Sequence, residues 1–259
     1  MKVFVFRGGL GNQIFEYFFY KKQLEINPSV KYIFPEKCHN GFEINKWFDV
    51  VLHKASVFDV ILYKILRKLD VSCLIADKDS EPEADNYFVL GYFQDKRYFN
   101  GLEIKFKTLQ LSESNKHYLN LIDSCESVAI HIRRGDYLQP PFDEIYGGIC
   151  TEEYYKSAID IVKRSIKNPV FFIFSNDKEW IKDNLHIDNA IYVDCNSGMN
   201  SPLDMFLMTH SKANIIANSS FSFWGAYLNR FAKLVVYPKR WYKSKYKVPD
   251  IFPSDWLGI

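Results

Sequence analysis

The chain has 259 residues, of which 47% are hydrophobic and 25% charged, a composition typical of a soluble globular protein with one large or two modest domains. Its formal net charge of +2 gives no electrostatic reason to expect nucleic acid or an acidic membrane surface as a partner. The sequence contains no apolar run near the roughly 20 residues of a membrane span, no signal-peptide pattern, and five scattered cysteines without metal-ligand spacing. These features predict a cytoplasmic protein with reduced thiols.

The first half opens with a predicted strand over 2–6, a glycine-rich loop from Arg7 to Gln13, and an aromatic-rich helix over 13–26. Glycines between a strand and a helix let backbone N–H groups approach a ligand, and a helix N-terminus favours an anion. The spacing G-G-x-G-N-Q is not the dinucleotide-binding fingerprint. Two interpretations therefore stay open: a loop that approaches an anionic ligand, and a tight turn whose glycines serve packing.

Further along, apolar periodicity predicts strands over 30–34 and from residue 88, a surface helix over 57–69, and mostly helix over 100–126. Asp77-x-Asp79 follows an apolar strand, as in many sugar-nucleotide enzymes that hold a divalent metal. Here the pair opens an acidic run that is typical of a solvated loop. We therefore favour the loop interpretation and expect no metal site.

From residue 127 onward, strands and helices alternate, which predicts a parallel sheet flanked by helices, a Rossmann-like arrangement. The predicted strands cover 128–132, 170–174, 190–193, 214–217 and 234–237. One predicted helix begins near Thr151, and three further predicted helices cover 178–184, 202–212 and 221–230. The chain thus divides into an N-terminal domain, 1–126, and a C-terminal domain, 127–259.

Polar clusters follow three of these strands: His131–Asp136, Ser175–Asp177 and Asn218–Ser220. In an open parallel sheet, ligands bind outside the carboxyl ends of the strands. Each cluster alone fits a helix cap, and the first also fits an internal ion pair with Asp136. Three clusters on one edge, one of them with two arginines whose planar forks match phosphate oxygens, favour an anionic nucleotide.

Asp204 lies on the predicted helix that precedes the strand over 214–217. Its carboxylate could cap that helix or accept hydrogen bonds from the N–H groups of a base. Both interpretations stay open at this point.

Five motifs occur in order along essentially the whole chain: GGLGNQ at 8–13, GYFQ at 91–94, HIRRGDY at 131–137, FSND at 174–177 and NSSFSFWGAYLN at 218–229. The set resembles the α-1,2-fucosyltransferases of glycosyltransferase family 11. The resemblance implies a GT-B-type α/β fold, with two Rossmann-like domains and a donor-binding cleft between them. It also implies inverting transfer of L-fucose from GDP-β-L-fucose to O2 of a β-galactoside, without a metal or other cofactor.

In the same resemblance, the N-terminal domain is mainly the acceptor side and the C-terminal domain binds the GDP-sugar. Arg133 is the predicted catalytic residue, because a fixed cation in a desolvated cleft stabilises the charge on departing GDP. The resemblance places His131 near the nucleotide, Asp204 on guanine, and Asn12 near the donor phosphates and fucose. The predicted donor-binding residues are Gly9, Gly11, Asn12, Gln13, His131, Arg133, Arg134, Asp136, Ser175, Asp177, Asp204, Asn218, Ser219, Ser220 and Phe221.

The chain departs from its relatives at Glu16, where an amide is common, and at Asn176, where Asp is frequent. The general base is not assigned, since Asp136, Glu16 and His39 are all conceivable. The expected partners are GDP-fucose and a galactose-containing glycan that could be carrier-linked, with no nucleic acid and at most peripheral membrane association. Such an enzyme would serve surface polysaccharide (O-antigen) or oligosaccharide synthesis.

Three alternatives stay open. One is a related transferase with another donor or linkage. The second is a metal-dependent transferase that uses Asp77-x-Asp79. The third is a non-catalytic module that binds a sugar or a nucleotide.

Overall fold

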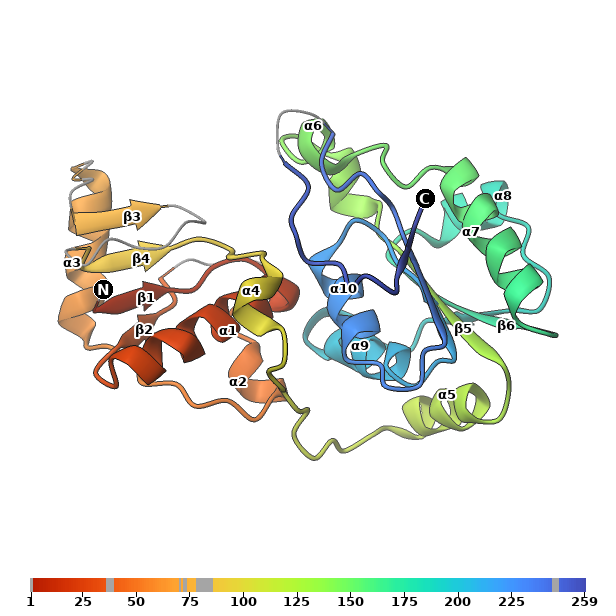
Figure 1. Ribbon diagram of the computed structural model, residues 1–259, viewed down its shortest axis with the longest axis horizontal. Helices are drawn as coiled ribbons and strands as arrows, with labels where there is room; N and C mark the ends of the chain where they lie inside the picture. Colours follow the sequence, from red (N-terminus) through yellow and green to blue (C-terminus); the bar gives the residue numbers. More distant parts are fainter. Residues whose placement is uncertain (1, 36–39, 70, 72–73, 78–85, 244–246) are drawn as a thin grey trace. The chain divides into compact units, whose positions relative to one another are not determined.

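The computed structural model describes residues 2–35, 40–69, 71, 74–77, 86–243 and 247–259. The chain forms two compact units, Met1–Thr108 and Leu109–Ile259 (Figure 1). The first holds a four-stranded sheet of order β2-β1-β4-β3 and the second a six-stranded sheet of order β10-β9-β8-β5-β6-β7. Neighbouring strands in both sheets are parallel, which confirms the predicted α/β class.

Unit 1 is built around a core of aromatic side chains. Its strands are β1 (Val3–Val5), β2 (Lys31–Ile33), β3 (Ile75–Asp77) and β4 (Phe88–Leu90). Its helices are α1 (Leu10–Ile26), α2 (Ile44–Trp47), α3 (Val57–Lys68) and α4 (Lys96–Phe99). Phe19 of α1 stacks on Phe93 with ring centroids 3.6 Å apart, and Phe4 of β1 lies 5.5 Å from Phe19. The aromatic side chains of α1 therefore belong to the core of unit 1.

Helix α1 begins three residues before its predicted start. Leu10 is buried, and the N–H groups of Asn12 and Gln13 both donate to the carbonyl oxygen of Gly9, at 2.9 and 3.0 Å. Gly9 is the N-cap, with an extended backbone. Most of the GGLGNQ motif therefore forms the first helical turn and not a loop.

The prediction of a mostly helical segment over 100–126 is wrong for its first part, because no helix forms over 101–112. Phe106 instead makes an antiparallel bridge to Phe48, and the N–H of Lys107 donates to the carbonyl oxygen of Trp47 at 2.9 Å. Backbone groups of this segment thus find partners in another strand-like segment and not within a helix.

Unit 2 contains the Rossmann-like sheet. Its strands are β5 (Ser127–Ile132), β6 (Val170–Ser175), β7 (Ala190–Val193), β8 (Ala213–Ile215), β9 (Leu234–Tyr237) and β10 (Leu257–Gly258). Its α-helices are α5 (Glu113–Asp123), α6 (Asp143–Tyr146), α7 (Glu152–Ser165), α8 (Lys178–Asn184), α9 (Pro202–Met208) and α10 (Ser220–Tyr227). Two short 3-10 helices are η2 (Gly135–Leu138) and η3 (Gly198–Asn200).

The six residues of β5 are buried on both faces of the sheet. Val128, Ile130 and Ile132 pack in one core with α7, whereas Ala129 packs in a second core on the opposite face. This alternation follows from the period of two along a strand. A central strand covered on both faces confirms the Rossmann-like prediction for this half.

Helix α5 belongs to unit 2, although the predicted boundary at 126/127 assigned it to the N-terminal domain. Its Ile122 is buried in the second core with Phe172 and Leu207, and the helix contacts α9. The division between the units therefore follows Thr108. Among the described helices, none is long and apolar enough to cross a membrane.

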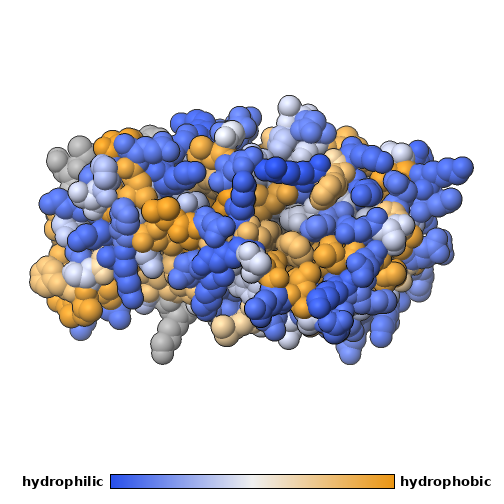
Figure 2. Space-filling model, turned by 90° about the horizontal axis from the view of Figure 1, so that it is seen from below, coloured by the Kyte–Doolittle hydropathy of each residue, from blue (hydrophilic) through white to orange (hydrophobic). Residues whose placement is uncertain are grey.

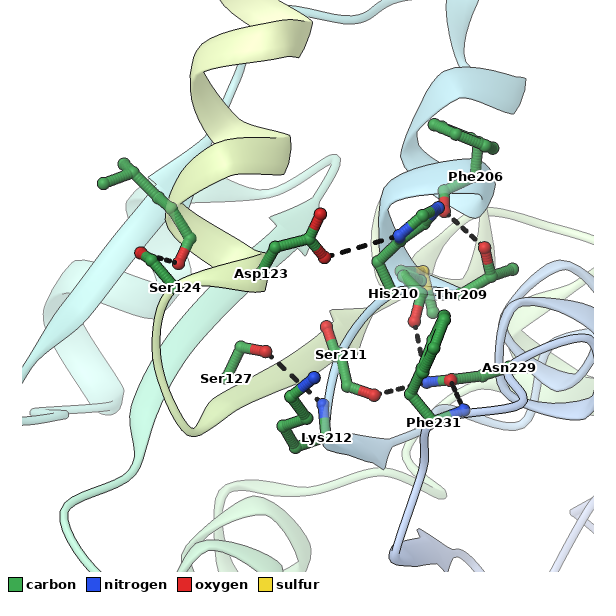
Figure 3. A network of polar contacts seen from close by, with 12 residues as sticks. Asp123, Ser124, Ser127, Phe206, Thr209, His210, Ser211, Lys212, Asn229 and Phe231 are labelled. Atoms are coloured by element: carbon green, nitrogen blue, oxygen red, sulfur yellow. Dashed lines mark hydrogen bonds and ion pairs between the residues drawn. The ribbon is translucent and has the colours of Figure 1, made fainter. Parts of the chain in front are cut away.

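A polar network joins the loops at the amino ends of β5 and β8 (Figure 3). Its centre is Asn229, which follows α10. Asn229 Nδ2 donates to the carbonyl oxygens of Ser211 (2.7 Å) and Met208 (3.2 Å) and to Asn214 Oδ1 (2.8 Å). Asn229 Oδ1 accepts from the N–H groups of Phe231 (2.8 Å) and Ala232 (3.1 Å). Beside it, His210 Nδ1 lies 3.4 Å from Asp123 Oδ1. Asn229 therefore holds the amino edge of the sheet.

Candidate functional site

The three predicted polar clusters lie at the carboxyl ends of β6, β5 and β8, which are neighbours in the sheet. Direct contacts join them. Arg134 Nε lies 3.1 Å from Asp177 Oδ2, and the Tyr137 hydroxyl donates to the carbonyl oxygen of Asn218 at 3.3 Å. Clusters that are far apart in the sequence thus form one edge, which is where open parallel sheets bind ligands.

Arg133 forms the internal ion pair that the sequence left open, since its Nη2 lies 2.8 Å from Asp136 Oδ2. The guanidinium also lies 5.7 Å from the centre of the Tyr137 ring. The pair is part-exposed, with 29% of the Arg133 and 32% of the Asp136 side chain accessible. An arginine has five N–H donors, so this one bond orients the fork and leaves donors for an anion.

Arg134 turns the other way and is held on α8. Its guanidinium lies 4.0 Å from the centre of the Trp180 ring and pairs with Asp177. Asp177 also caps α8 by accepting from the Trp180 N–H at 3.1 Å, and Ser175 Oγ accepts from the Asp177 N–H at 3.0 Å. These contacts give Arg134, Asp177 and Ser175 a structural role, and their contact with a donor stays a prediction.

His131, near the end of β5, is a buried neutral imidazole. Burial, together with the positive charge of Arg133, lowers the pKa of His131 from 6.5 to about 3. Its Nδ1 has no hydrogen-bond partner in the described part of the chain, and its ring lies 5.5 Å from that of Phe221. His131 can therefore offer a hydrogen bond to a ligand through Nδ1 but no charge to a phosphate.

The buried Asn218 holds the third cluster in place. Its Nδ2 donates to the carbonyl oxygens of Tyr146 and Trp241, both at 3.2 Å, and its Oδ1 accepts from Cys150 Sγ at 3.4 Å. The burial that this packing imposes raises the pKa of the Cys150 thiol to about 12. With its amide engaged on both sides, Asn218 shapes the site, and its contact with a donor stays a prediction.

The first turn of α10 is the part of this cluster that remains available. Ser219 is the N-cap, with an extended backbone and no side-chain cap, and its hydroxyl hydrogen-bonds to the Tyr137 side chain. The first N–H groups of a helix have no intrahelical acceptor, and those of Ser220 and Phe221 stand at this position. The arrangement favours an anion.

Asp204 does not cap its helix. Its Oδ1 accepts from Asn196 Nδ2 at 2.7 Å, and the N-cap residue of α9 is Ser201, which makes no side-chain cap bond. Burial raises the pKa of Asp204 from 3.8 to about 7, while the bond from Asn196 lowers it. The capping interpretation therefore fails, and a carboxyl group poised near neutral pH remains for a ligand.

Asn196 and Asn115 support Asp204, and sequence reasoning missed both. Their amides bond each other reciprocally, with both N–O distances at 2.9 Å. Asn196 follows β7 at the same sheet edge, a position that could have singled it out. Asn115 lies in the first turn of α5, where it looks like an ordinary helix residue.

In unit 1, the GGLGNQ and GYFQ motifs meet, because Gln94 Nε2 donates to Asn12 Oδ1 at 3.2 Å. Gly8 has a φ of +74°, and a Cβ there would lie 2.8 Å from Asn12 Nδ2, so glycine is required next to Asn12. Asn12 is only partly buried. Asn12 can therefore still contact the sugar-nucleotide donor. That contact stays a prediction, as do the predicted donor contacts of Gly9 and Gly11.

Gln13 and Glu16 are fully buried and hold the loops. Gln13 Nε2 donates to the carbonyl oxygens of Gly8 and Gly41, both at 2.9 Å, and its Oε1 accepts from the N–H of Glu43 at 2.9 Å. Both oxygens of Glu16 accept from the Arg7 N–H, at 3.2 and 3.1 Å. These contacts favour a structural role for Gln13 over the predicted donor contact, and they argue against Glu16 as a base.

Two residues of the sequence hypotheses, His39 and Asp79, lie outside the described residues. Within the described ranges, no group of three or more His, Cys, Asp or Glu side chains is arranged to hold a metal ion.

Comparisons with known proteins bear on the fold and on the family of the chain. A crystal structure of the fucosyltransferase NodZ from Bradyrhizobium matches the fold with a TM-score of 0.51 at 10% identity, over 90% of this chain and 94% of that one. Together, the two parallel α/β units and this likeness define a GT-B-type fold.

The model of the family "Glycosyl transferase family 11" matches residues 45–259. The chain is 30% identical to an alpha-1,2-colitosyltransferase of Escherichia coli over 97% of its own length and 96% of the relative. It is 32% identical to the O-antigen biosynthesis glycosyltransferase WbnK of Escherichia coli over 84% and 72%, and 28% identical to human galactoside alpha-(1,2)-fucosyltransferase 1 over 51% and 38%. The chain belongs to glycosyltransferase family 11, as the motifs indicated.

Proposed function

We propose that this glycosyltransferase moves L-fucose from GDP-β-L-fucose to O2 of a β-galactoside, with inversion and without a metal. The observation that carries the proposal is Arg133, a part-exposed and oriented guanidinium on the same sheet edge as the uncapped first turn of α10. Unit 2 would bind the GDP portion of the donor, and acceptor recognition would fall mainly to unit 1. The product would be a surface polysaccharide or an oligosaccharide.

The main chemical demand is the negative charge that builds up on the departing GDP. Arg133 would meet the diphosphate with the donors that Asp136 leaves unused, and the N–H groups of Ser220 and Phe221 would add a neutral anion site. Because Asp136 fixes the guanidinium before the donor arrives, little reorganisation is needed when the charge develops.

Guanine presents two neighbouring N–H donors, on N1 and on the 2-amino group. A carboxylate is their natural acceptor, so Asp204 must be ionised to accept from both. Asn196 donates to one oxygen of Asp204 and thereby favours the ionised form. The Asn196–Asn115 pair would thus keep Asp204 in the state that binds the base.

No residue is assigned as the general base. One oxygen of Asp136 is paired with Arg133, and both oxygens of Glu16 accept from the Arg7 N–H. If the transition state has the oxocarbenium character expected for such a transfer, the acceptor hydroxyl needs only a weak base, and the leaving phosphate can supply one.

A second candidate donor is the nucleotide-linked form of colitose. It is favoured by the similarity to the alpha-1,2-colitosyltransferase over nearly the full length of both chains. Colitose lacks the 3-hydroxyl group that fucose carries, so the two donors differ by one hydrogen-bonding group on the transferred sugar.

The deciding experiment incubates the purified chain with GDP-fucose or GDP-colitose, EDTA, and a panel of β-galactosides, and measures GDP release. Acceptor-dependent release from GDP-fucose in EDTA supports the proposal. Release from GDP-colitose alone identifies the second donor, and activity that is lost in EDTA and restored by Mg²⁺ contradicts metal independence. Binding of neither donor contradicts both candidates.

A further inference from the structure

Helix α3 exposes an apolar face in addition to the one it buries. Its inner face packs Tyr63 and Leu66 against the unit 1 core. The outer face carries large apolar side chains with these exposed fractions: Val57 76%, Phe58 68%, Ile61 51%, Ile65 49% and Leu69 65%. The apolar spacing at 61, 65 and 69 therefore predicts the helix correctly, but it marks the exposed face.

These side chains form one stripe and are not scattered. Residues four positions apart are neighbours on a helix surface, and Val57, Ile61, Ile65 and Leu69 follow that spacing from the first residue of α3 to its C-cap, Leu69. Figure 2 shows hydrophobic side chains in the surface at the end of the view where α3 lies in Figure 1. Single exposed apolar residues are ordinary, whereas a contiguous patch indicates an interaction surface.

Among the described residues of α3 and the segment before it, the exposed charges beside this stripe are positive. Lys64 and Lys68 of α3 and the nearby Lys54 are exposed. The one acidic residue of α3, Asp59, is buried and accepts hydrogen bonds from Ser56 and from the Tyr87 hydroxyl, at 2.6 and 2.9 Å. The outer face of α3 is therefore apolar and cationic, a local asymmetry that the small net charge of the chain conceals.

We propose that the outer face of α3 binds the surface of an anionic lipid bilayer. An interfacial helix places apolar side chains at the boundary of headgroups and acyl chains, while lysines at its border reach the anionic headgroups. A second copy of the chain fits less well, because a two-fold contact along α3 would bring Lys64 and Lys68 of both copies together without an acidic partner from the helix. The surface belongs to unit 1, whereas the residues assigned to GDP belong to unit 2.

This inference goes beyond the proposed function and does not depend on which sugar is transferred. It gives the chain a means of residing where a lipid-linked acceptor would be presented. An acceptor of that kind remains a prediction from the sequence.

Vesicle sedimentation tests the proposal with the full chain and two lipid compositions, phosphatidylcholine alone and phosphatidylcholine mixed with phosphatidylglycerol. We expect the chain to sediment with the mixed vesicles and not with phosphatidylcholine alone. Ile61→Ser/Ile65→Ser should weaken binding at least about tenfold, since it removes two apolar groups from the stripe. Lys64→Gln and Lys68→Gln should each weaken it by roughly fivefold at low salt.

Matched controls come from the same unit. Ile26→Ser changes an exposed apolar residue at the end of α1, and Lys105→Gln changes an exposed lysine; both should bind like the parent chain. Because all these positions are exposed, the melting temperature should stay unchanged in each variant. The proposal is overturned if the parent chain binds neither vesicle, or if Ile61→Ser/Ile65→Ser binds as the parent does. A dimer interface on α3 would also overturn the proposal. It would be seen as a dimer of the parent chain that the Ile61→Ser/Ile65→Ser substitutions dissociate but that stays intact when vesicles are added.

Discussion

The two edges of the sheet in unit 2 use the same kinds of polar residue in different ways. At the amino edge, Asn229 is fully hydrogen-bonded and His210 is paired with Asp123. Among the described residues of this network, the one buried polar atom without a partner is the hydroxyl oxygen of Ser211. At the carboxyl edge, two buried atoms that lack a partner in the described part of the chain, His131 Nδ1 and Asp136 Oδ1, belong to ionisable groups.

This difference separates residues that build the fold from residues poised for a ligand. Buried polar groups normally find partners within the protein, and ionisable groups left poorly satisfied in one place are typical of functional sites. Residue type alone does not make the distinction. Asn229 and Asn218 both belong to the family motif over 218–229, and both hold the structure.

The largest effect should come from Arg133→Ala. We expect a loss of about 10²–10³ in kcat, equivalent to about 2.7–4 kcal/mol of transition-state stabilisation, with the fold retained because the Arg133–Asp136 pair is part-exposed. Steady-state transfer assays and thermal melts measure both. Arg164→Ala, an exposed arginine near the end of α7, is the control and should transfer normally. A well-folded Arg133→Ala with near-normal turnover contradicts the assignment.

At the opposite edge, Asn229→Ala should affect stability and not chemistry. Several buried backbone groups lose their partner, which should lower the free energy of unfolding by about 2–3 kcal/mol. Urea unfolding measures this loss, and the kcat of the remaining folded protein should be unchanged. Asn184→Ala, which removes a single side-chain bond to the Trp180 carbonyl oxygen, should cost less than about 1.5 kcal/mol. If folded Asn229→Ala loses as much kcat as Arg133→Ala does, the claim that the amino edge serves stability and not chemistry is wrong.

Asp204 should make donor binding depend on pH. Its pKa is about 7 in the folded chain and near 3.8 when unfolded. Between these values the folded state binds more protons, so the contribution of Asp204 to stability falls as pH rises through this window. Guanine needs the carboxylate, so the affinity for GDP-fucose should rise with pH and should fall by up to about tenfold per pH unit below about pH 7.

Calorimetric titration with GDP-fucose from about pH 5.5 to pH 8 measures this dependence, and GDP-fucose has no terminal phosphate that titrates in the range. Asp204→Asn should bind weakly with little dependence on pH. It should also stabilise the fold more at the upper end of the range than at the lower end. A parent chain whose affinity is constant across this range contradicts the role of Asp204.

The smallest effect concerns Asn196, which donates to Asp204. Asn196→Ala removes a bond that lowers the pKa of Asp204, so the pH midpoint of GDP-fucose binding should move upward and the affinity at neutral pH should fall a few-fold, by about 1 kcal/mol. Asn120→Ala, on the exposed side of α5, should leave the midpoint in place. An unchanged pH midpoint in Asn196→Ala would contradict the proposed effect of Asn196 on the pKa of Asp204.

Much of unit 2 could be predicted, because its signals are local. Alternating strands and helices fixed the class, Thr151 caps α7 as expected through a bond from the Tyr154 N–H at 3.4 Å, and polar residues after β5, β6 and β8 indicated the functional edge. What could not be predicted depends on tertiary contacts. Asn115 meets Asn196 only because α5 packs against α9, and the periodicity of α3 could not tell which of its two apolar faces the core would cover.

Hydrogen exchange of the full chain with and without GDP-fucose tests the central claim, that the carboxyl edge of unit 2 binds the nucleotide. We predict slower exchange over 131–137, 196–204 and 219–223 when the donor is present, and unchanged exchange over 206–212 and 229–231 at the amino edge. Under conditions where calorimetry shows GDP-fucose to be bound, protection confined to the amino edge, or absent from all three carboxyl-edge segments, would contradict the account.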